Sequence, residues 1–69
     1  MGGKGIMPLI TIKTFEGKTR EQKKKWIKEI TRVSMEVLGT QDPSIFTVII
    51  QEIPKENWGK GGVPASELS

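Results

Sequence analysis

The chain contains neither cysteine nor histidine among its 69 residues. Without cysteine no disulfide can form, and without either residue only carboxylate and carbonyl oxygens remain as strong metal ligands. These absences argue against a zinc or copper site, and we expect no metal. A domain of this size hides only about 60% of its unfolded surface. Oligomerisation is then the remaining common way to stabilise so small a core.

Long apolar runs are also absent. No stretch approaches the roughly 20 apolar residues that cross a bilayer, and the glycine-rich residues 1–7 lack the apolar centre of a signal peptide. We therefore expect a cytoplasmic protein with no membrane partner. Residues 1–7 are expected to be a flexible leader (a tag remnant, a misassigned start or an extension), and residues 8–69 to form one domain. The net charge of +3 suits a small anionic ligand as well as nucleic acid.

Two apolar segments predict β-strands. Residues 8–15, PLITIKTF, and residues 45–53, IFTVIIQEI, are rich in β-branched residues. Both segments carry apolar residues at successive positions, so we expect both strands to be covered on both faces. Pro8 is tolerated at the start of a strand because no ladder donor is needed there. Pro54 is expected to end the second strand.

The segment between them predicts one helix, from about Arg20 to Leu38. Thr19 and Gln22 form a capping-box pattern before it, and Gly39 stands where a left-handed residue commonly ends a helix. Apolar residues at helical spacing are expected to form one stripe, and four lysines are expected largely away from it. The stripe residues are Trp26, Ile27, Ile30, Val33, Val37 and Leu38, and the lysines are Lys23, Lys24, Lys25 and Lys28.

These elements predict a small α/β fold. Two strands joined by a helix of this length make a β-α-β unit with parallel strands and a right-handed crossover. The glycine-dense segment 58–63, WGKGGV, is suited to a C-terminal β-hairpin. One helix covers only one face of a two-stranded sheet, so we expect oligomerisation to complete the sheet and another copy of the chain to cover its open face.

Five short segments occur in an order and at spacings that resemble one known family. They are Pro8 at the start of a strand, Glu16-Gly17-Lys18-Thr19, Glu21-Gln22-Lys23, Val48-Ile49-Ile50-Gln51-Glu52 and Asn57-Trp58-Gly59-x-Gly61-Gly62. Together they resemble the 4-oxalocrotonate tautomerase family over nearly everything from Pro8 to about Glu67. Members of that family are β-α-β subunits that usually assemble as hexamers. They use an N-terminal proline to move a proton in a 2-oxo or enol acid, without cofactor or metal.

The resemblance implies a role for four residues. Pro8 matches the catalytic proline, which requires translation to start at Met7 and that methionine to be removed. Lys18 falls where the family has a substrate-binding arginine, and Trp58 where it has a bulky aromatic beside the proline. Thr47 aligns with a second arginine, if one residue is inserted before it, so that charge is missing here. The cations that could replace it from another subunit are Arg32, Lys55 and Lys60.

These residue types suit proton transfer. A free N-terminal proline is a secondary amine and hence a base, whereas an acylated proline is an amide. Burial beside an apolar ring disfavours the ammonium form and lowers its pKa towards the operating pH, and a nearby Lys18 lowers it further. The same lysine would attract a substrate carboxylate and stabilise an enolate oxygen. The resemblance thus implies a cofactor-independent isomerase that acts as a homohexamer on a small anionic 2-oxo acid, and the uncharged Thr47 makes a monoacid a candidate substrate.

Three other interpretations were weighed. Gly17-Lys18-Thr19 ends like a phosphate-binding P-loop, but Ile12 stands where that motif needs glycine. Nucleic-acid binding through the helix lysines is disfavoured because glutamates are interspersed along the same helix, and steeply salt-dependent affinity would be its signature. The third is a non-catalytic protein with the tautomerase fold that only assembles, its Pro8 blocked by the leader. A protein without a free proline should show no keto–enol activity.

Overall fold

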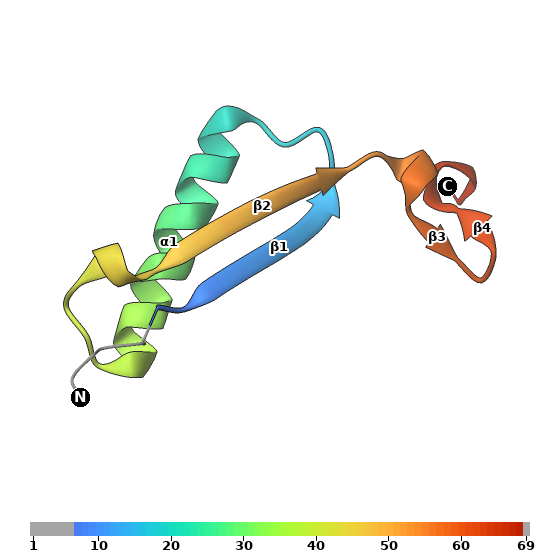
Figure 1. Cartoon of the computed structure of the whole chain (residues 1–69). Coiled ribbons are helices and arrows are strands. Elements are labelled where there is room, and N and C mark those ends of the chain that lie inside the picture. The colour runs from blue at the N-terminus through green and yellow to red at the C-terminus, as the bar shows by residue number, and fades with distance from the viewer. Residues whose placement is uncertain (1–6, 69) are drawn as a thin grey trace.

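The computed structural model describes residues 7–68 and shows one β-α-β unit followed by an extended arm (Figure 1). Strand β1 (Leu9–Phe15) is followed by helix α1 (Arg20–Leu38) and strand β2 (Thr47–Ile53). The two strands are parallel and pair in register from Leu9–Thr47 to Phe15–Ile53. The predicted fold class is therefore confirmed. Six of the seven leader residues, 1–6, lie outside the described residues.

Local capping fixes both ends of α1. The Thr19 side chain accepts a hydrogen bond from the Gln22 backbone at 3.0 Å, and the Gln22 side chain accepts one from the Thr19 backbone at 2.9 Å. This reciprocal pair satisfies two N–H groups that have no partner inside the helix. At the other end Gly39 has φ 70°, the left-handed conformation that glycine adopts without a Cβ penalty. The predicted helix limits are confirmed.

The second strand is shorter than predicted, because it begins at Thr47 and not at Ile45. A 3-10 turn, η1 (Pro43–Ile45), precedes it. The Asp42 carboxylate accepts a hydrogen bond from the Ser44 backbone at 3.0 Å, and the Phe46 backbone N–H donates to the Pro43 carbonyl at 3.2 Å. Backbone groups used in this turn are not available for sheet pairing. The strand therefore starts after the turn, although the β-branched pattern begins earlier.

The helix covers one face of the sheet and leaves the other open. Ile10 and Ile50 point towards α1 and are half-buried, whereas Leu9 and Ile49 on the opposite face remain 62% and 43% exposed. The single chain thus leaves one face open, as predicted, and the cover of that face by another copy of the chain stays a prediction. The alternation follows from the two-residue period of a strand, which sends neighbouring side chains to opposite faces.

The C-terminal residues form an arm that extends away from the β-α-β unit (Figure 1). The predicted hairpin is present as β3 (Gly59–Lys60) and β4 (Val63–Pro64), which pair antiparallel between the 3-10 turns η2 (Lys55–Asn57) and η3 (Ala65–Glu67). The chain measures 48 × 26 × 14 Å and its radius of gyration is 15.8 Å. A compact chain of this length would have a radius of gyration of roughly 11 Å.

The single chain has almost no interior. Ala65 is the only buried residue among residues 7–68, and several large apolar side chains there are exposed. They are Met7, Leu9, Ile27, Val33, Val37, Leu38, Ile49, Val63 and Leu68. The predicted helical stripe is therefore only partly covered by the sheet. Within the described residues α1 falls short of the length and apolarity that a membrane-spanning helix requires.

Candidate active site

Pro8 and Thr47 lie side by side at one end of the sheet. The Thr47 backbone N–H donates a 3.0 Å hydrogen bond to the Pro8 carbonyl oxygen, which joins the start of β2 to the residue before β1. Pro8 is half-buried and Thr47 is exposed. We call these two residues the proline end. Both residues were predicted to belong to one site, and the structure brings them together.

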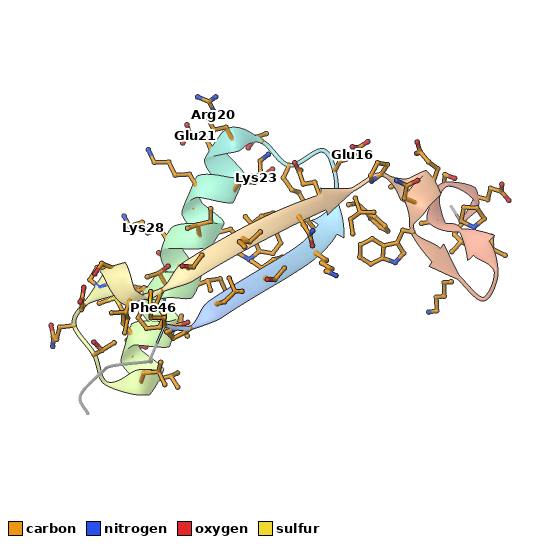
Figure 2. All side chains as sticks on the ribbon, viewed as in Figure 1. Glu16, Arg20, Glu21, Lys23, Lys28 and Phe46 are labelled. Carbon is orange, nitrogen blue, oxygen red and sulfur yellow. The ribbon has the colours of Figure 1, made fainter. Side chains whose placement is uncertain are left out.

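An apolar depression of about 270 Å³ lies beside Pro8. Its walls come from the first strand, the second half of α1 and the residue before β2, and Ser34 is their only polar side chain. Figure 2 shows Phe46 at this end of the molecule, next to α1. The lining residues are Pro8, Ile10, Val33, Ser34, Val37, Leu38 and Phe46. An amine placed among such side chains is more easily kept neutral than one in water.

Lys18 and Trp58 both contact Phe15 at the other end of the sheet. The Lys18 ammonium donates a 3.2 Å hydrogen bond to the Phe15 carbonyl oxygen. The Trp58 and Phe15 rings meet edge to face, with centroids 4.7 Å apart and an interplanar angle of 63°. The Lys55 ammonium lies 5.5 Å from the centre of the Phe15 ring. We call Lys18 and Trp58 the lysine end.

The proline end and the lysine end are separated by the whole of β1. That strand has seven residues, and each residue of a strand advances about 3.3 Å, so the two ends are roughly 20 Å apart. No small substrate spans that distance. The four residues were predicted to form one site, and a single chain does not assemble it. The predicted length of the first strand already implies that Pro8 and Lys18 of one chain lie too far apart to share a site.

Glu52 connects the turn that carries Lys18 to the helix. One carboxylate oxygen of Glu52 accepts a hydrogen bond from the Lys18 backbone N–H at 3.1 Å, and the other accepts from the Lys23 ammonium at 2.9 Å. The Glu52 side chain is 23% exposed. The Lys23 hydrogen bond, followed by the Lys18 backbone N–H, lowers the pKa of the Glu52 carboxyl below its ordinary value.

The helix lysines were predicted to lie largely away from the apolar stripe, and Lys23 is the one of the four that departs from this, being half-buried and paired with Glu52. Figure 2 shows Lys23 on the side of α1 next to β2, opposite the side of Lys28 and Glu21. Lys23 precedes Trp26 by three residues, which puts both side chains on one helix face. This spacing, together with an acidic residue on the facing strand, could have predicted that Lys23 faces the sheet.

The three cations considered as replacements for the missing arginine differ in their surroundings. Arg32 is engaged by Glu29 at 2.8 Å and Glu36 at 3.5 Å, and the three side chains are exposed, so these pairs contribute little to stability. Lys55 is at the lysine end, over the Phe15 ring. Lys60 is an exposed residue of the hairpin.

The chain is thus a minimal β-α-β unit with a proline before its first strand and a hairpin arm after its second. The model of the tautomerase enzyme family matches residues 8–67, beginning at that proline. The chain therefore belongs to the tautomerase family, whose enzymes are of the isomerase type. The resemblance found in the sequence is confirmed.

Individual relatives agree with the family match. The chain is 44% identical to a 2-hydroxymuconate tautomerase of Comamonas testosteroni over 62 residues, covering 90% of this chain and 97% of the relative. A solved 4-oxalocrotonate tautomerase isozyme from Methylibium petroleiphilum superposes with a TM-score of 0.81 at 42% identity, covering 90% and 98%. A heterohexameric 4-oxalocrotonate tautomerase from Chloroflexus aurantiacus superposes with a TM-score of 0.80 at 28% identity, covering 91% and 100%.

Proposed function

We propose that this protein is a cofactor-independent tautomerase in which Pro8, as the first residue, is the general base. The family match that begins at Pro8 carries this proposal. The proline nitrogen removes a proton from one carbon or enol oxygen of an enolisable 2-oxo acid and returns a proton to another carbon. The apolar depression beside Pro8 supports the role, because it favours the neutral amine that a base must be.

The site is proposed to be composite, with the proline end of one copy meeting the lysine end of another. In that arrangement Lys18 binds the substrate carboxylate and stabilises negative charge on the enolate oxygen, and Trp58 keeps water from the pocket. The roughly 20 Å between the two ends supports this, as does a chain whose described part buries a single residue. We expect a cytoplasmic homohexamer, in which further copies cover the open sheet face and the arm.

A monocarboxylate is the proposed substrate class. Thr47 is the residue beside Pro8 in the sheet, and it carries no charge. Pro8, Ile10 and the helix residues that line the depression also lack charge. Lys18 then supplies the cation that binds the acid, since the Lys55 ammonium at the same end lies over the Phe15 ring, and one such cation matches one carboxylate. A dicarboxylate would leave its second charge without a partner in an apolar pocket, which is costly.

The test compares two forms of the chain that differ at the proline nitrogen. One form begins at Pro8, verified by intact mass, and the other retains residues 1–7. Ketonisation of phenylenolpyruvate, followed by ultraviolet absorbance, is expected for the first form and absent for the second. If the form that begins at Pro8 assembles but is inert towards phenylenolpyruvate and 2-hydroxymuconate alike, the catalytic proposal is wrong and the chain is a non-catalytic assembly protein with the tautomerase fold.

A further inference from the structure

The Glu52 side chain contacts both the Lys18 turn and the helix behind it. It lies on β2 opposite Thr14, on the face of the sheet that α1 covers. Its two oxygens are divided between two donors: the Lys18 backbone N–H at 3.1 Å and the Lys23 ammonium at 2.9 Å. The carboxylate therefore fixes a backbone position in the turn and a side chain on the helix at once.

The turn needs such an anchor because its backbone leaves the sheet at Phe15 and enters the helix only at Arg20. Gly17 has φ 111°, so the chain changes direction immediately before Lys18. Lys18 itself lies between the last pair of the β1–β2 ladder and the capping box of Thr19. The hydrogen bond to Glu52 thus ties the Lys18 backbone directly to β2.

The charges around Lys18 are arranged so that its ammonium stays without a counter-ion. Its hydrogen bond goes to the neutral carbonyl oxygen of Phe15 at 3.2 Å, and none of the ion pairs within residues 7–68 includes Lys18. The nearby Glu52 carboxylate is neutralised by Lys23 at 2.9 Å. A carboxylate without that partner would compete with an anionic substrate for the Lys18 ammonium.

We propose that Glu52 and Lys23 are positioning residues for substrate binding: Glu52 fixes the turn that presents Lys18, and Lys23 prevents Glu52 from pairing with Lys18. Neither residue touches the substrate. The inference rests on the proposed function, because it assigns these residues to the carboxylate-binding role of Lys18. It goes further in making the affinity for the acid depend on a salt bridge on the helix side of the sheet.

The first experiment is a double-mutant cycle on the form that begins at Pro8, with an enolisable monocarboxylate as substrate. Glu52→Ala is expected to raise KM about tenfold with a smaller change in kcat, because a hydrogen bond to a charged group is lost. Glu52→Gln keeps an acceptor oxygen for the Lys18 N–H and is expected to raise KM less. In a Lys18→Met background Glu52→Ala should raise KM no further. A purely structural role would lower activity by the same factor in both backgrounds, and that result would overturn the proposal.

The second experiment tests the counter-charge. Lys23→Met leaves the Glu52 carboxylate unpaired and is expected to raise KM. Adding Glu52→Gln to Lys23→Met removes the competing charge and should restore KM towards the wild-type value. Lys24→Met is the matched control, since Lys24 is an exposed neighbour on α1 that is not among the partners of Glu52. If Lys23→Met leaves KM unchanged, or if Glu52→Gln fails to rescue it, the counter-charge role is wrong.

A measurement independent of activity separates this inference from the proposed function. Amide hydrogen exchange at Lys18 should be faster in Glu52→Ala than in the wild type and in Glu52→Gln. If wild-type protein that begins at Pro8 is inert, the proposed function fails, while protection of the Lys18 amide still reports whether Glu52 holds the turn. Equal exchange in Glu52→Ala and the wild type would overturn the positioning role whatever the activity.

Discussion

The Pro8 carbonyl oxygen accepts a 3.0 Å hydrogen bond from the Thr47 backbone N–H. This bond joins the residue before β1 to the first residue of β2 through the main chain. The proline ring takes no part in it, since a proline nitrogen carries no proton to donate when it lies within a chain. Fold and chemistry therefore use different atoms of Pro8, and a substitution can separate them.

Pro8→Ala is expected to abolish most activity and leave the assembly intact. The alanine keeps the carbonyl that Thr47 binds, whereas its amine is no longer held in position by a ring. Loss of a correctly placed general base lowers kcat by about 10²-fold or more. Steady-state kinetics on a chain verified to begin at residue 8 gives the rate, and analytical ultracentrifugation gives the oligomer. An unchanged rate would remove Pro8 from the mechanism.

Thr47→Arg is expected to change substrate preference. It introduces a cation next to Pro8, where the structure has an exposed, uncharged side chain. An arginine binds a carboxylate through two parallel hydrogen bonds, so kcat/KM should rise for a dicarboxylate enol such as 2-hydroxymuconate. The value for phenylenolpyruvate should change much less. A similar gain for both substrates would mean that the new charge acts on the proline pKa and does not bind a second carboxylate.

Acid should weaken the protein partly through Glu52. The Lys23 hydrogen bond, and then the Lys18 backbone N–H, hold the pKa of Glu52 below 4.5 in the folded state. A group with a lowered folded pKa stabilises the fold above its unfolded pKa, and this contribution is lost as the pH falls through the folded value. As the pH falls below 4.5, wild-type protein should therefore lose stability more steeply than Glu52→Gln.

Urea unfolding at one fixed protein concentration measures this difference, since the stability of an oligomer depends on concentration. Glu29 and Asp42 also have pKa values lowered by hydrogen bonds, from Arg32 and Ser44 respectively. Both groups are present in the two proteins compared, so their effects cancel. Parallel pH profiles for the wild type and Glu52→Gln would show that the Glu52 contacts do not contribute to stability.

Local sequence signals predict the fold well where partners are near in the chain. The helix limits follow from Thr19, Gln22 and Gly39, all within one turn of the ends they cap. The predicted start of β2 was wrong because the turn at Pro43 competes with the β-branched pattern. The predicted position of Lys23 failed because its partner, Glu52, lies on a strand 29 residues away.

The candidate site depends on information of a different kind. The identities of Pro8, Lys18, Thr47 and Trp58 came from a resemblance, since nothing in composition or spacing distinguishes a basic proline from a structural one. Their separation along β1 follows from strand geometry. Which copy supplies the other half of a site is a property of the assembly, and the open sheet face alone does not determine it.

Mixing two impaired variants tests whether each site is shared between copies. Pro8→Ala lacks the proline end and Lys18→Met the lysine end, so each variant alone should be impaired. In oligomers refolded from an equal mixture, a site combines Pro8 of one copy with Lys18 of another. If the variants assemble at random, about a quarter of the sites have both wild-type residues. Activity should then rise to about a quarter of the wild-type value.

The control for this complementation is the double variant, Pro8→Ala with Lys18→Met, mixed with an equal amount of wild-type chain. Random assembly again gives about a quarter of intact sites when the residues come from different copies, but about a half when both come from one chain. The two mixtures therefore give equal activities only for a shared site. A double-variant mixture at half activity, together with no recovery from the single variants, would show that one chain brings Pro8 and Lys18 together in the assembled protein.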